Sequence, residues 1–237
     1  MKPLKKASEM TAKELARYID QSVLKPEFTE AEIRKYIQEG IDYGCATVCI
    51  NPFSLDIATE MTKGTDTKIC VVCDFPFGLS TTASKVMQAE SYCSRGDVDE
   101  LDVVANYGLL KSGRWDEVVA DIKAVTEVCH EYETIVKVIL ETDALTKEEI
   151  IAGTRAVVAA GADFVKSSTG FFTGAACVGA TKDVVRIMMD AAEGKVKVKG
   201  SGGIRSREHF LELIDMGIDR MGVGYKSTPV VLATENS

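Results

Sequence analysis

The sequence predicts an α/β protein in which eight parallel strands and their helices form one (β/α)₈, or TIM, barrel, with an extra helix before the first strand. Short runs rich in β-branched residues alternate with longer segments of helical spacing, and this alternation is typical of a parallel sheet. The chain has 237 residues, which leaves about 30 residues for each of eight units, the size of one βα repeat. No linker or compositional break interrupts the pattern, so we expect a single domain over residues 1–237.

The expected strands are short and rich in valine and isoleucine. They cover residues 19–24, 46–51, 68–74, 100–106, 134–141, 162–167, 196–200 and 220–224. Residues 11–18 have the spacing of a helix and precede the first strand, so they predict the extra helix at the bottom of the barrel. Residues 228–237 leave room for only a short last helix.

The expected helices begin at recognisable N-caps. Thr29 and Thr146 each stand three residues before a glutamate, which is the pattern of a capping box. The first of these helices is expected to end at Gly40 and the second at Gly161, and Ser206 opens a third. An open, doubly wound sheet is the alternative fold. Its first turn is usually rich in glycine, whereas residues 24–27 contain none, so the closed barrel is favoured.

Composition and charge limit the classes of partner. The chain is 46% hydrophobic and 27% charged, as in ordinary globular proteins. Acidic residues outnumber lysine plus arginine by 36 to 28, and the net charge of −8 would repel a nucleic-acid backbone or an anionic membrane. No run approaches the roughly 18 apolar residues that a membrane span requires. We therefore expect neither nucleic acid nor a membrane as a partner.

The cysteines and histidines do not suggest a metal site. Seven cysteines, with no apolar run near the N-terminus, predict reduced thiols and a cytoplasmic location. Cys70 and Cys73 lie in an expected strand, where residues three apart face opposite sides. His130 and His209 stand alone. We therefore expect buried thiols that pack as small hydrophobic groups, with no metal and no other cofactor.

Four ionisable residues lie where strands are expected to end, namely Asp20, Asp102, Lys166 and Lys199. Active sites of (β/α)₈ barrels lie at the carboxyl ends of the strands. A single lysine at such a position could simply extend into water. Two lysines on neighbouring strands, with a carboxylate across the barrel, instead favour a functional site, because lysine is seldom buried unless it is paired.

The lysine pair predicts a particular chemistry. An amine attacks a carbonyl only when it is neutral, and a free lysine has a pKa of about 10.4. Lowering that pKa by about three units takes about 4 kcal/mol. A second ammonium about 4 Å away supplies about that much at an effective dielectric constant of about 20. The pair therefore predicts a Schiff-base enzyme that needs no metal.

A glycine-rich turn follows the seventh expected strand and includes Gly202 and Gly203. In barrels of this type the loops after strands seven and eight commonly bind phosphate through backbone N–H groups. Two glycines also suit any tight turn, but the position directly after a strand lysine favours phosphate. Lys226, after the eighth strand, could add positive charge.

At these positions the sequence resembles the deoxyribose-phosphate aldolases. The similar stretches are GADFVKSSTG at 161–170 and VKGSGGIR at 198–205, then ELDVVAN at 100–106, and more weakly 19–26, 49–52 and 137–142. The resemblance extends over residues 18–224. It implies a class I aldolase that reversibly splits 2-deoxyribose 5-phosphate into acetaldehyde and glyceraldehyde 3-phosphate, in deoxyribonucleoside catabolism.

The resemblance also implies roles for individual residues. Lys166 would form the imine, and Lys199 would lower its pKa and donate protons. Asp102 would relay protons through a water, with Asp20 and Ser22 completing the relay. The residues expected to contact substrate or its phosphate are Ser201, Gly202, Gly203, Lys226 and Thr169. The partners would be a small aldehyde and a sugar phosphate. Class I barrels often pair, so a homodimer is one option, although no sequence feature locates an interface.

Some positions depart from the family pattern and leave alternatives open. Gly224 and Tyr225 replace small hydroxyl residues that help to hold the phosphate, and the loop at 174–179 is a few residues longer than usual. One alternative is therefore a Schiff-base aldolase for an unphosphorylated or bulkier aldehyde. Another is a sugar-phosphate-binding barrel without catalysis, against which the intact lysine pair and Asp102 count.

Overall fold

The protein folds as a closed barrel of eight parallel strands, which confirms the predicted fold class. The computed structural model describes residues 3–234, and the strands follow one another around the barrel in sequence order. They are β1 (Ile19–Val23), β2 (Thr47–Ile50), β3 (Lys68–Cys73), β4 (Glu100–Val104), β5 (Ile135–Ile139), β6 (Phe164–Lys166), β7 (Lys197–Ser201) and β8 (Arg220–Gly224).

The backbone groups into two compact units. One comprises residues up to 71 together with those from 204 onward, and the other comprises residues 72–203. The expectation of a single domain over the whole chain stays a prediction.

In the first unit β1 pairs in parallel with β2 and with β8. The unit also contains 3₁₀ turns and helices, which are η1 (Ala7–Glu9), α1 (Ala12–Ala16), α2 (Glu30–Tyr43), η2 (Pro52–Ser54), α3 (Leu55–Thr62), α9 (Arg207–Met216) and α10 (Thr228–Leu232). The extra helix predicted before the first strand is α1, which packs against α2 and α10. The last helix is short, as expected. The prediction for 228–237 also covers residues 235–237, which lie outside the described range.

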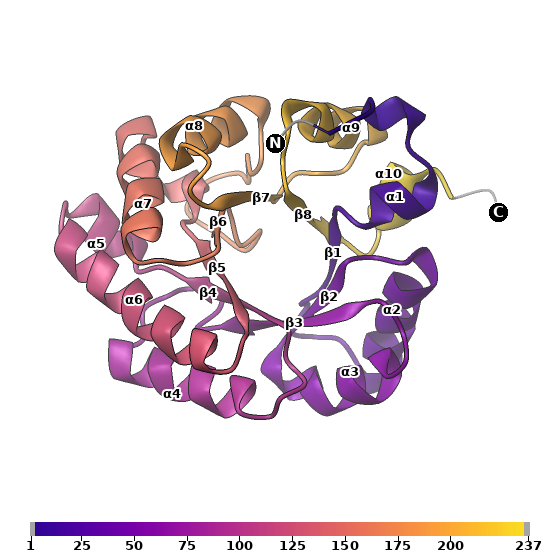
Figure 1. The fold of residues 1–237 in the computed structure, drawn as a ribbon, viewed down its shortest axis with the longest axis horizontal. Helices are drawn as coiled ribbons and strands as arrows, with labels where there is room; N and C mark the ends of the chain where they lie inside the picture. The colour runs from indigo at the N-terminus through magenta and orange to yellow at the C-terminus, as the bar shows by residue number, and fades with distance from the viewer. Residues whose placement is uncertain (1–2, 235–237) are drawn as a thin grey trace. The chain divides into compact units, whose positions relative to one another are not determined.

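In the second unit β4, β5, β6 and β7 pair in parallel with one another. Helices on their outer side cover these strands (Figure 1). They are α4 (Thr82–Cys93), α5 (Tyr107–Lys111), α6 (Trp115–Glu131), α7 (Lys147–Ala159) and α8 (Lys182–Ala192), and η3 (Thr142–Ala144) follows β5. The register places Lys166 beside both Ile139 and Lys199.

The predicted helix starts are confirmed, and one predicted end is wrong. Thr29 and Thr146 both form complete capping boxes, and the Ser206 side chain caps α9. Helix α2 continues beyond Gly40 to a left-handed Gly44. Gly40 does not end the helix. It lies where the helix packs closely on β2, because a Cβ there would lie 2.8 Å from the Val48 side chain.

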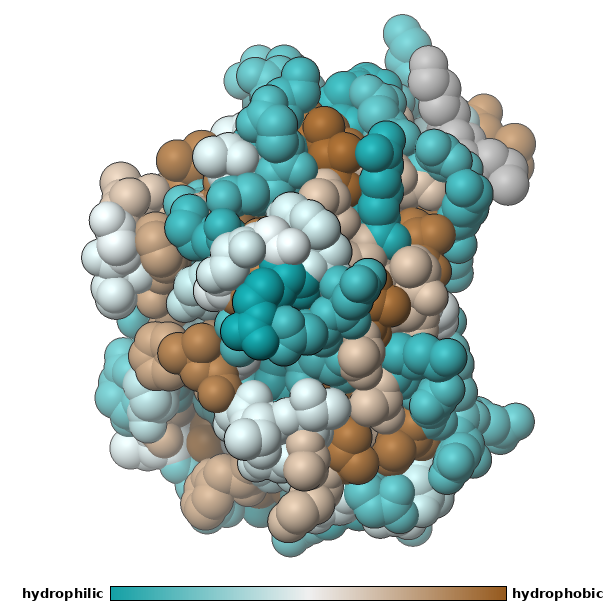
Figure 2. All heavy atoms as spheres, turned by 90° about the vertical axis from the view of Figure 1, so that its left-hand side faces the viewer, coloured by the Kyte–Doolittle hydropathy of each residue, from teal (hydrophilic) through white to brown (hydrophobic). Residues whose placement is uncertain are grey.

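The outer face formed by α5, α6 and α7 is largely hydrophilic, with hydrophobic residues scattered among polar ones (Figure 2). The apolar side of each helix is turned inward; in α6, for example, Val118, Ile122 and Val125 are buried. Within residues 3–234, the helices are all too short or too polar to span a lipid bilayer.

A buried ion pair ties α4 to α6. The Lys85 side chain is fully buried, and its Nζ lies 2.7 Å from Asp121 Oδ2. The same ammonium donates to the Val104 carbonyl at 3.1 Å, and the Thr82 hydroxyl donates to Asp121 Oδ1 at 2.7 Å. A single lysine near the start of helix α4 gave no sign of this role in the sequence. Because both charges are shielded from water, each depends on the other for compensation.

We predict that Lys85→Met lowers the free energy of unfolding by about 3–5 kcal/mol, because it leaves the buried Asp121 carboxylate without its counter-charge. Urea unfolding followed by circular dichroism measures the change. Lys123→Met is the matched control, since Lys123 pairs with Glu127 on the exposed side of α6 and its loss should leave the midpoint unchanged. Equal effects of the two substitutions would contradict the prediction.

Candidate active site

The Asp102 carboxylate lies at the centre of a buried cluster of lysines. Asp102 is completely buried. Its Oδ1 lies 2.9 Å from Lys137 Nζ, and its Oδ2 lies 2.7 Å from Lys166 Nζ and 2.7 Å from Lys199 Nζ. The structure thus brings together the two predicted lysines and the predicted aspartate, through a single shared oxygen.

Strand register explains how the cluster forms. Asp102 stands opposite Lys137 in the β4–β5 ladder, and Lys166 stands opposite Lys199 in the β6–β7 ladder. Lys166 is the last residue of β6, as expected, whereas Asp102 and Lys199 lie in the middle of their strands. Their predicted position at strand ends is therefore wrong. Each strand continues for two further residues beyond the charged one, and the carboxylate compensates the buried ammonium groups.

Sequence reasoning missed two members of the cluster, Lys137 and Glu100. Lys137 is fully buried, and its Nζ lies 2.5 Å from Glu100 Oε2. The signal was present in the alternation of β4, where Glu100 and Asp102 are two residues apart and so share one face. Lys137 interrupts the apolar strand β5 at the matching register position, which marks it as a partner of these carboxylates.

The charges of this cluster nearly balance. Three lysines face two carboxylates, so loss of one proton from one lysine makes the five residues formally neutral. Burial would raise the pKa of Asp102, but the charges of Lys137, Lys166 and Lys199 outweigh burial and hold that pKa well below the usual value. Asp102 is thus ionised at neutral pH. Its contribution to stability is present above the unfolded pKa of about 3.9 and is lost as the pH falls through the lower folded value.

Hydroxyl groups join the ends of β6 and β7 just beyond the lysines. Ser201 is buried, and its hydroxyl donates to the Ser168 carbonyl at 2.5 Å. Its backbone N–H donates to Ser167 Oγ at 2.9 Å, and Ser167 Oγ donates in turn to the Ser201 carbonyl at 2.9 Å. The Ser201 side chain, predicted to contact substrate, therefore holds two strand ends together.

The predicted phosphate turn, Gly202–Gly203, comes directly after β7. Gly203 is exposed, and Gly202 is partly exposed. The Ala180 N–H donates to the Gly202 carbonyl at 3.0 Å, so the loop after β6 runs beside this turn. The turn presents backbone groups at the carboxyl end of the strand that carries Lys199.

Thr169, also predicted to contact substrate, is engaged within the protein. Its hydroxyl donates to Glu141 and accepts from the Phe171 N–H at 2.9 Å. Glu141 is 1% exposed and adopts a left-handed φ of 59°. Burial raises the pKa of Glu141, against the hydrogen bonds from Thr169. Thr169 thus shapes the turn that follows Lys166.

Three predicted site residues belong to the first unit, and their roles stay predictions. Asp20 is the second residue of β1, not its end as expected, and its Oδ1 lies 2.6 Å from Arg220 Nη1. The expectation is wrong because Arg220 compensates the charge of Asp20, so the strand can continue beyond this residue. Ser22 stands opposite Gly224 in register. Lys226 is exposed, and its Nζ lies 5.7 Å from the centre of the Tyr225 ring.

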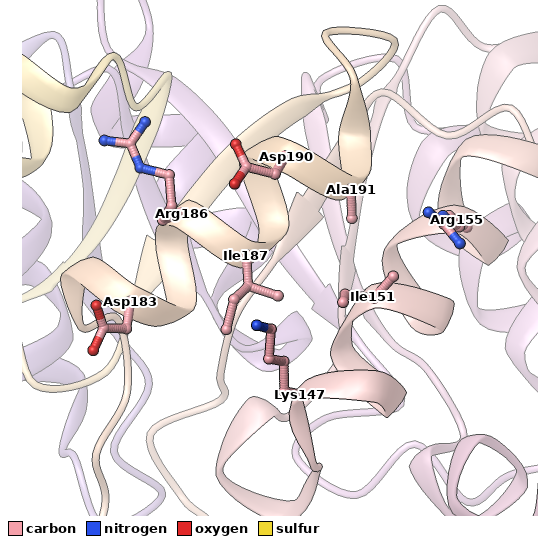
Figure 3. Close-up of a pocket in the computed structure, with 8 residues that line it drawn as sticks. All are labelled: Lys147, Ile151, Arg155, Asp183, Arg186, Ile187, Asp190 and Ala191. Carbon is pink, nitrogen blue, oxygen red and sulfur yellow. The ribbon is translucent and has the colours of Figure 1, made fainter.

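A separate groove of about 640 Å³ lies between α7 and α8. Figure 3 shows that it is lined by residues of these two helices, with Ile151 and Ile187 between them and Arg186 pointing away from α7. Its charged side chains are of both signs and exposed; they are Lys147, Arg155, Asp183, Arg186 and Asp190. It does not combine buried nucleophiles with a carboxylate, as the Asp102 cluster does.

Proteins similar to this chain in sequence and in structure include deoxyribose-phosphate aldolases. The chain is 42% identical to deoxyribose-phosphate aldolase 1 of Staphylococcus aureus over 87% of its length and 90% of that protein. It is 43% identical to the deoxyribose-phosphate aldolase of Clostridium kluyveri over 90% of its length and 95% of that protein. The structure of a tetrameric deoxyribose phosphate aldolase from Aeropyrum pernix matches 96% of this chain and 93% of its own, with a TM-score of 0.84 and 28% identity.

The sequence profile of one family covers nearly the whole chain. The DeoC/LacD family aldolase profile matches residues 15–226, a range that includes every strand of the barrel and all the lysines of the Asp102 cluster. Because this profile matches most of the chain, and because the chain is 42% identical to a relative over 90% of that relative's length, the chain belongs to the DeoC/LacD aldolase family.

Proposed function

We propose that this protein is a deoxyribose-phosphate aldolase of class I, which reversibly cleaves 2-deoxyribose 5-phosphate into acetaldehyde and glyceraldehyde 3-phosphate. The family, and relatives that carry this name over most of the chain, support the reaction. The Asp102 cluster supports a Schiff-base route, because it places the amine of Lys166 beside a carboxylate and a second ammonium that can exchange protons with it.

The observation that carries the proposal is the difference in burial among the three lysines. Lys166 keeps 3% of its surface exposed, whereas Lys137 and Lys199 are fully buried. Lys166 also ends its strand, on the side of the barrel where substrates bind. If one proton leaves the cluster, a neutral Lys166 is the amine that an aldehyde can reach. Lys199 keeps the positive charge beside it, on the same carboxylate oxygen.

The covalent chemistry follows from a neutral Lys166. Its Nζ attacks C1 of the open-chain sugar, and the carbonyl oxygen takes up a proton to give a carbinolamine. Loss of water then gives the protonated imine. We assign the proton transfers to Asp102, which contacts Lys166 directly, and to Lys199, whose ammonium is the adjacent donor.

Cleavage of the sugar uses the imine as an electron sink. A base removes the proton of the C3 hydroxyl, the C2–C3 bond breaks, and its electron pair moves to C2 to form an enamine while glyceraldehyde 3-phosphate leaves. Protonation of C2 and hydrolysis of the imine then release acetaldehyde and regenerate Lys166. The buried counter-ion Lys137, which is itself paired with Glu100, keeps Asp102 in place throughout.

We assign the phosphate to the backbone of Gly202 and Gly203. The proposal also includes contacts with the substrate, or with the water that relays protons, from five further residues. They are Asp20, Ser22, Lys226, Ser201 and Thr169. We also propose a cytoplasmic location, which seven free cysteines support, and a homo-oligomer of at least two copies, since the Aeropyrum pernix relative is tetrameric.

A second candidate is an aldolase for an unphosphorylated or bulkier aldehyde. It is favoured by the end of β8, where Gly224 has open space around it. The next residue, Tyr225, supplies an aromatic ring whose centre lies 3.9 Å from that of Tyr36. An open position beside an aromatic cluster suits an apolar group better than a phosphate.

The two candidates predict different substrate preferences. With a chelator present, the first predicts that kcat/KM for 2-deoxyribose 5-phosphate exceeds that for 2-deoxyribose by about a hundredfold or more, because charge-assisted hydrogen bonds to phosphate are lost with the smaller sugar. A coupled assay for released acetaldehyde measures both rates. Similar rates for the two sugars would contradict the first candidate and favour the second.

We further predict that Lys199→Leu lowers kcat/KM for 2-deoxyribose 5-phosphate by about tenfold or more, because it removes the ammonium that shares Asp102 Oδ2 with Lys166 and is the adjacent proton donor. Steady-state rates at a single pH measure the loss. Lys197→Leu, at an exposed position of the same strand, is the control, and an unchanged kcat/KM in Lys199→Leu would refute the role.

A further inference from the structure

The loop after β6 lies directly against the glycine turn. A Cβ placed on Gly179 would lie 2.3 Å from the Gly202 carbonyl oxygen, and one on Gly203 would lie 3.0 Å from the Val178 carbonyl oxygen. The Ala180 N–H donates to the same Gly202 carbonyl at 3.0 Å. Residues 178–180, which we call the loop segment, thus form one wall of the turn.

One carboxylate holds the loop segment in place. Asp143, in the 3₁₀ turn η3 after β5, accepts through Oδ1 from the Val178 N–H at 3.0 Å and from the Gly179 N–H at 2.8 Å. Two successive backbone N–H groups form a concave anion site, and Asp143 fills it from within the protein. Hydrogen bonds to an ionised acceptor are about twice as strong as neutral ones.

Apolar burial contributes little to the part of the loop before Gly179. Residues 173–178 are all exposed, and the Val178 side chain is 59% exposed. The second oxygen of Asp143, Oδ2, is buried and accepts no hydrogen bond from any residue between 3 and 234. The two N–H groups of the loop are therefore the polar contacts that removal of this carboxylate would break.

We propose that Asp143 is a specificity-determining positioning residue, which holds the loop segment against Gly202–Gly203 and thereby sets the shape of the turn that binds the substrate phosphate. The inference rests on the proposed function. A site built from backbone N–H groups binds an anion well only while those groups are already oriented. Asp143 acts through the loop and does not contact the substrate in this account.

The proposal predicts a loss confined to phosphorylated ligands. Asp143→Ala should lower kcat/KM for 2-deoxyribose 5-phosphate by about tenfold or more, mostly through KM, and change that for 2-deoxyribose less than about twofold. The inhibition constant of inorganic phosphate should rise by a similar factor. Asp143→Asn keeps an oxygen acceptor for the two N–H groups and should restore most of the preference.

Two further variants separate this role from general damage. Gly179→Ala should reproduce the loss, because its Cβ would clash with the Gly202 backbone, whereas Gly161→Ala has the same left-handed conformation with open space around it and should not. Asp163→Ala removes another carboxylate that accepts a backbone N–H, from Val136 at 2.8 Å. It should not alter the ratio of the two substrates.

The outcomes distinguish this inference from the proposed function. Borohydride reduction in the presence of acetaldehyde should trap the imine equally in the wild type and in Asp143→Ala, and failure to trap it in the wild type would overturn the proposed function. The inference alone would be overturned if the wild type prefers the phosphorylated sugar and the Asp143→Ala variant keeps both this preference and the affinity for inorganic phosphate. Equal losses on both sugars would also overturn it.

Discussion

Three lysines can share the interior of this barrel only because a carboxylate lies among them. Each buried ammonium would cost several kcal/mol without a partner, and Asp102 supplies one partner to all three. In the proposed reaction the same contact determines the chemistry. It holds Lys199 beside Lys166, which is the one lysine of the cluster that keeps any exposed surface. The stability of the site and the proposed chemistry thus depend on the same group.

The parallel sheet provides the required precision. Register sets Asp102 beside Lys137 and Lys166 beside Lys199 without any flexible segment. Beyond the lysines, serine hydroxyls join β6 to β7, so the strand ends hold their spacing where the substrate would bind. The loop after β6, which Asp143 holds, lies against the glycine turn beyond the lysines.

The sequence predicted the barrel well because strand and helix alternation is a local signal. Lys166 and Lys199 could be found because each follows a valine in a strand-like run, although only Lys166 ends its strand. Lys137 was missed because its partners are distant in sequence and only register reveals them. Asp20 was placed at a strand end because its compensating arginine lies at the other end of the chain. The contact of Asp143 with the loop after β6 joins segments 35 residues apart and leaves no periodic pattern.

The most direct test of the account is to identify the lysine that forms the imine. The protein would be incubated with acetaldehyde, reduced with borohydride and digested, and the modified peptide would be sequenced by mass spectrometry. We predict a single modified lysine, Lys166, because it is the one member of the cluster that keeps some exposed surface, 3%, and no modification of this peptide in Lys166→Arg. Modification of Lys137 or Lys199 instead, or of neither these nor Lys166, would contradict the account.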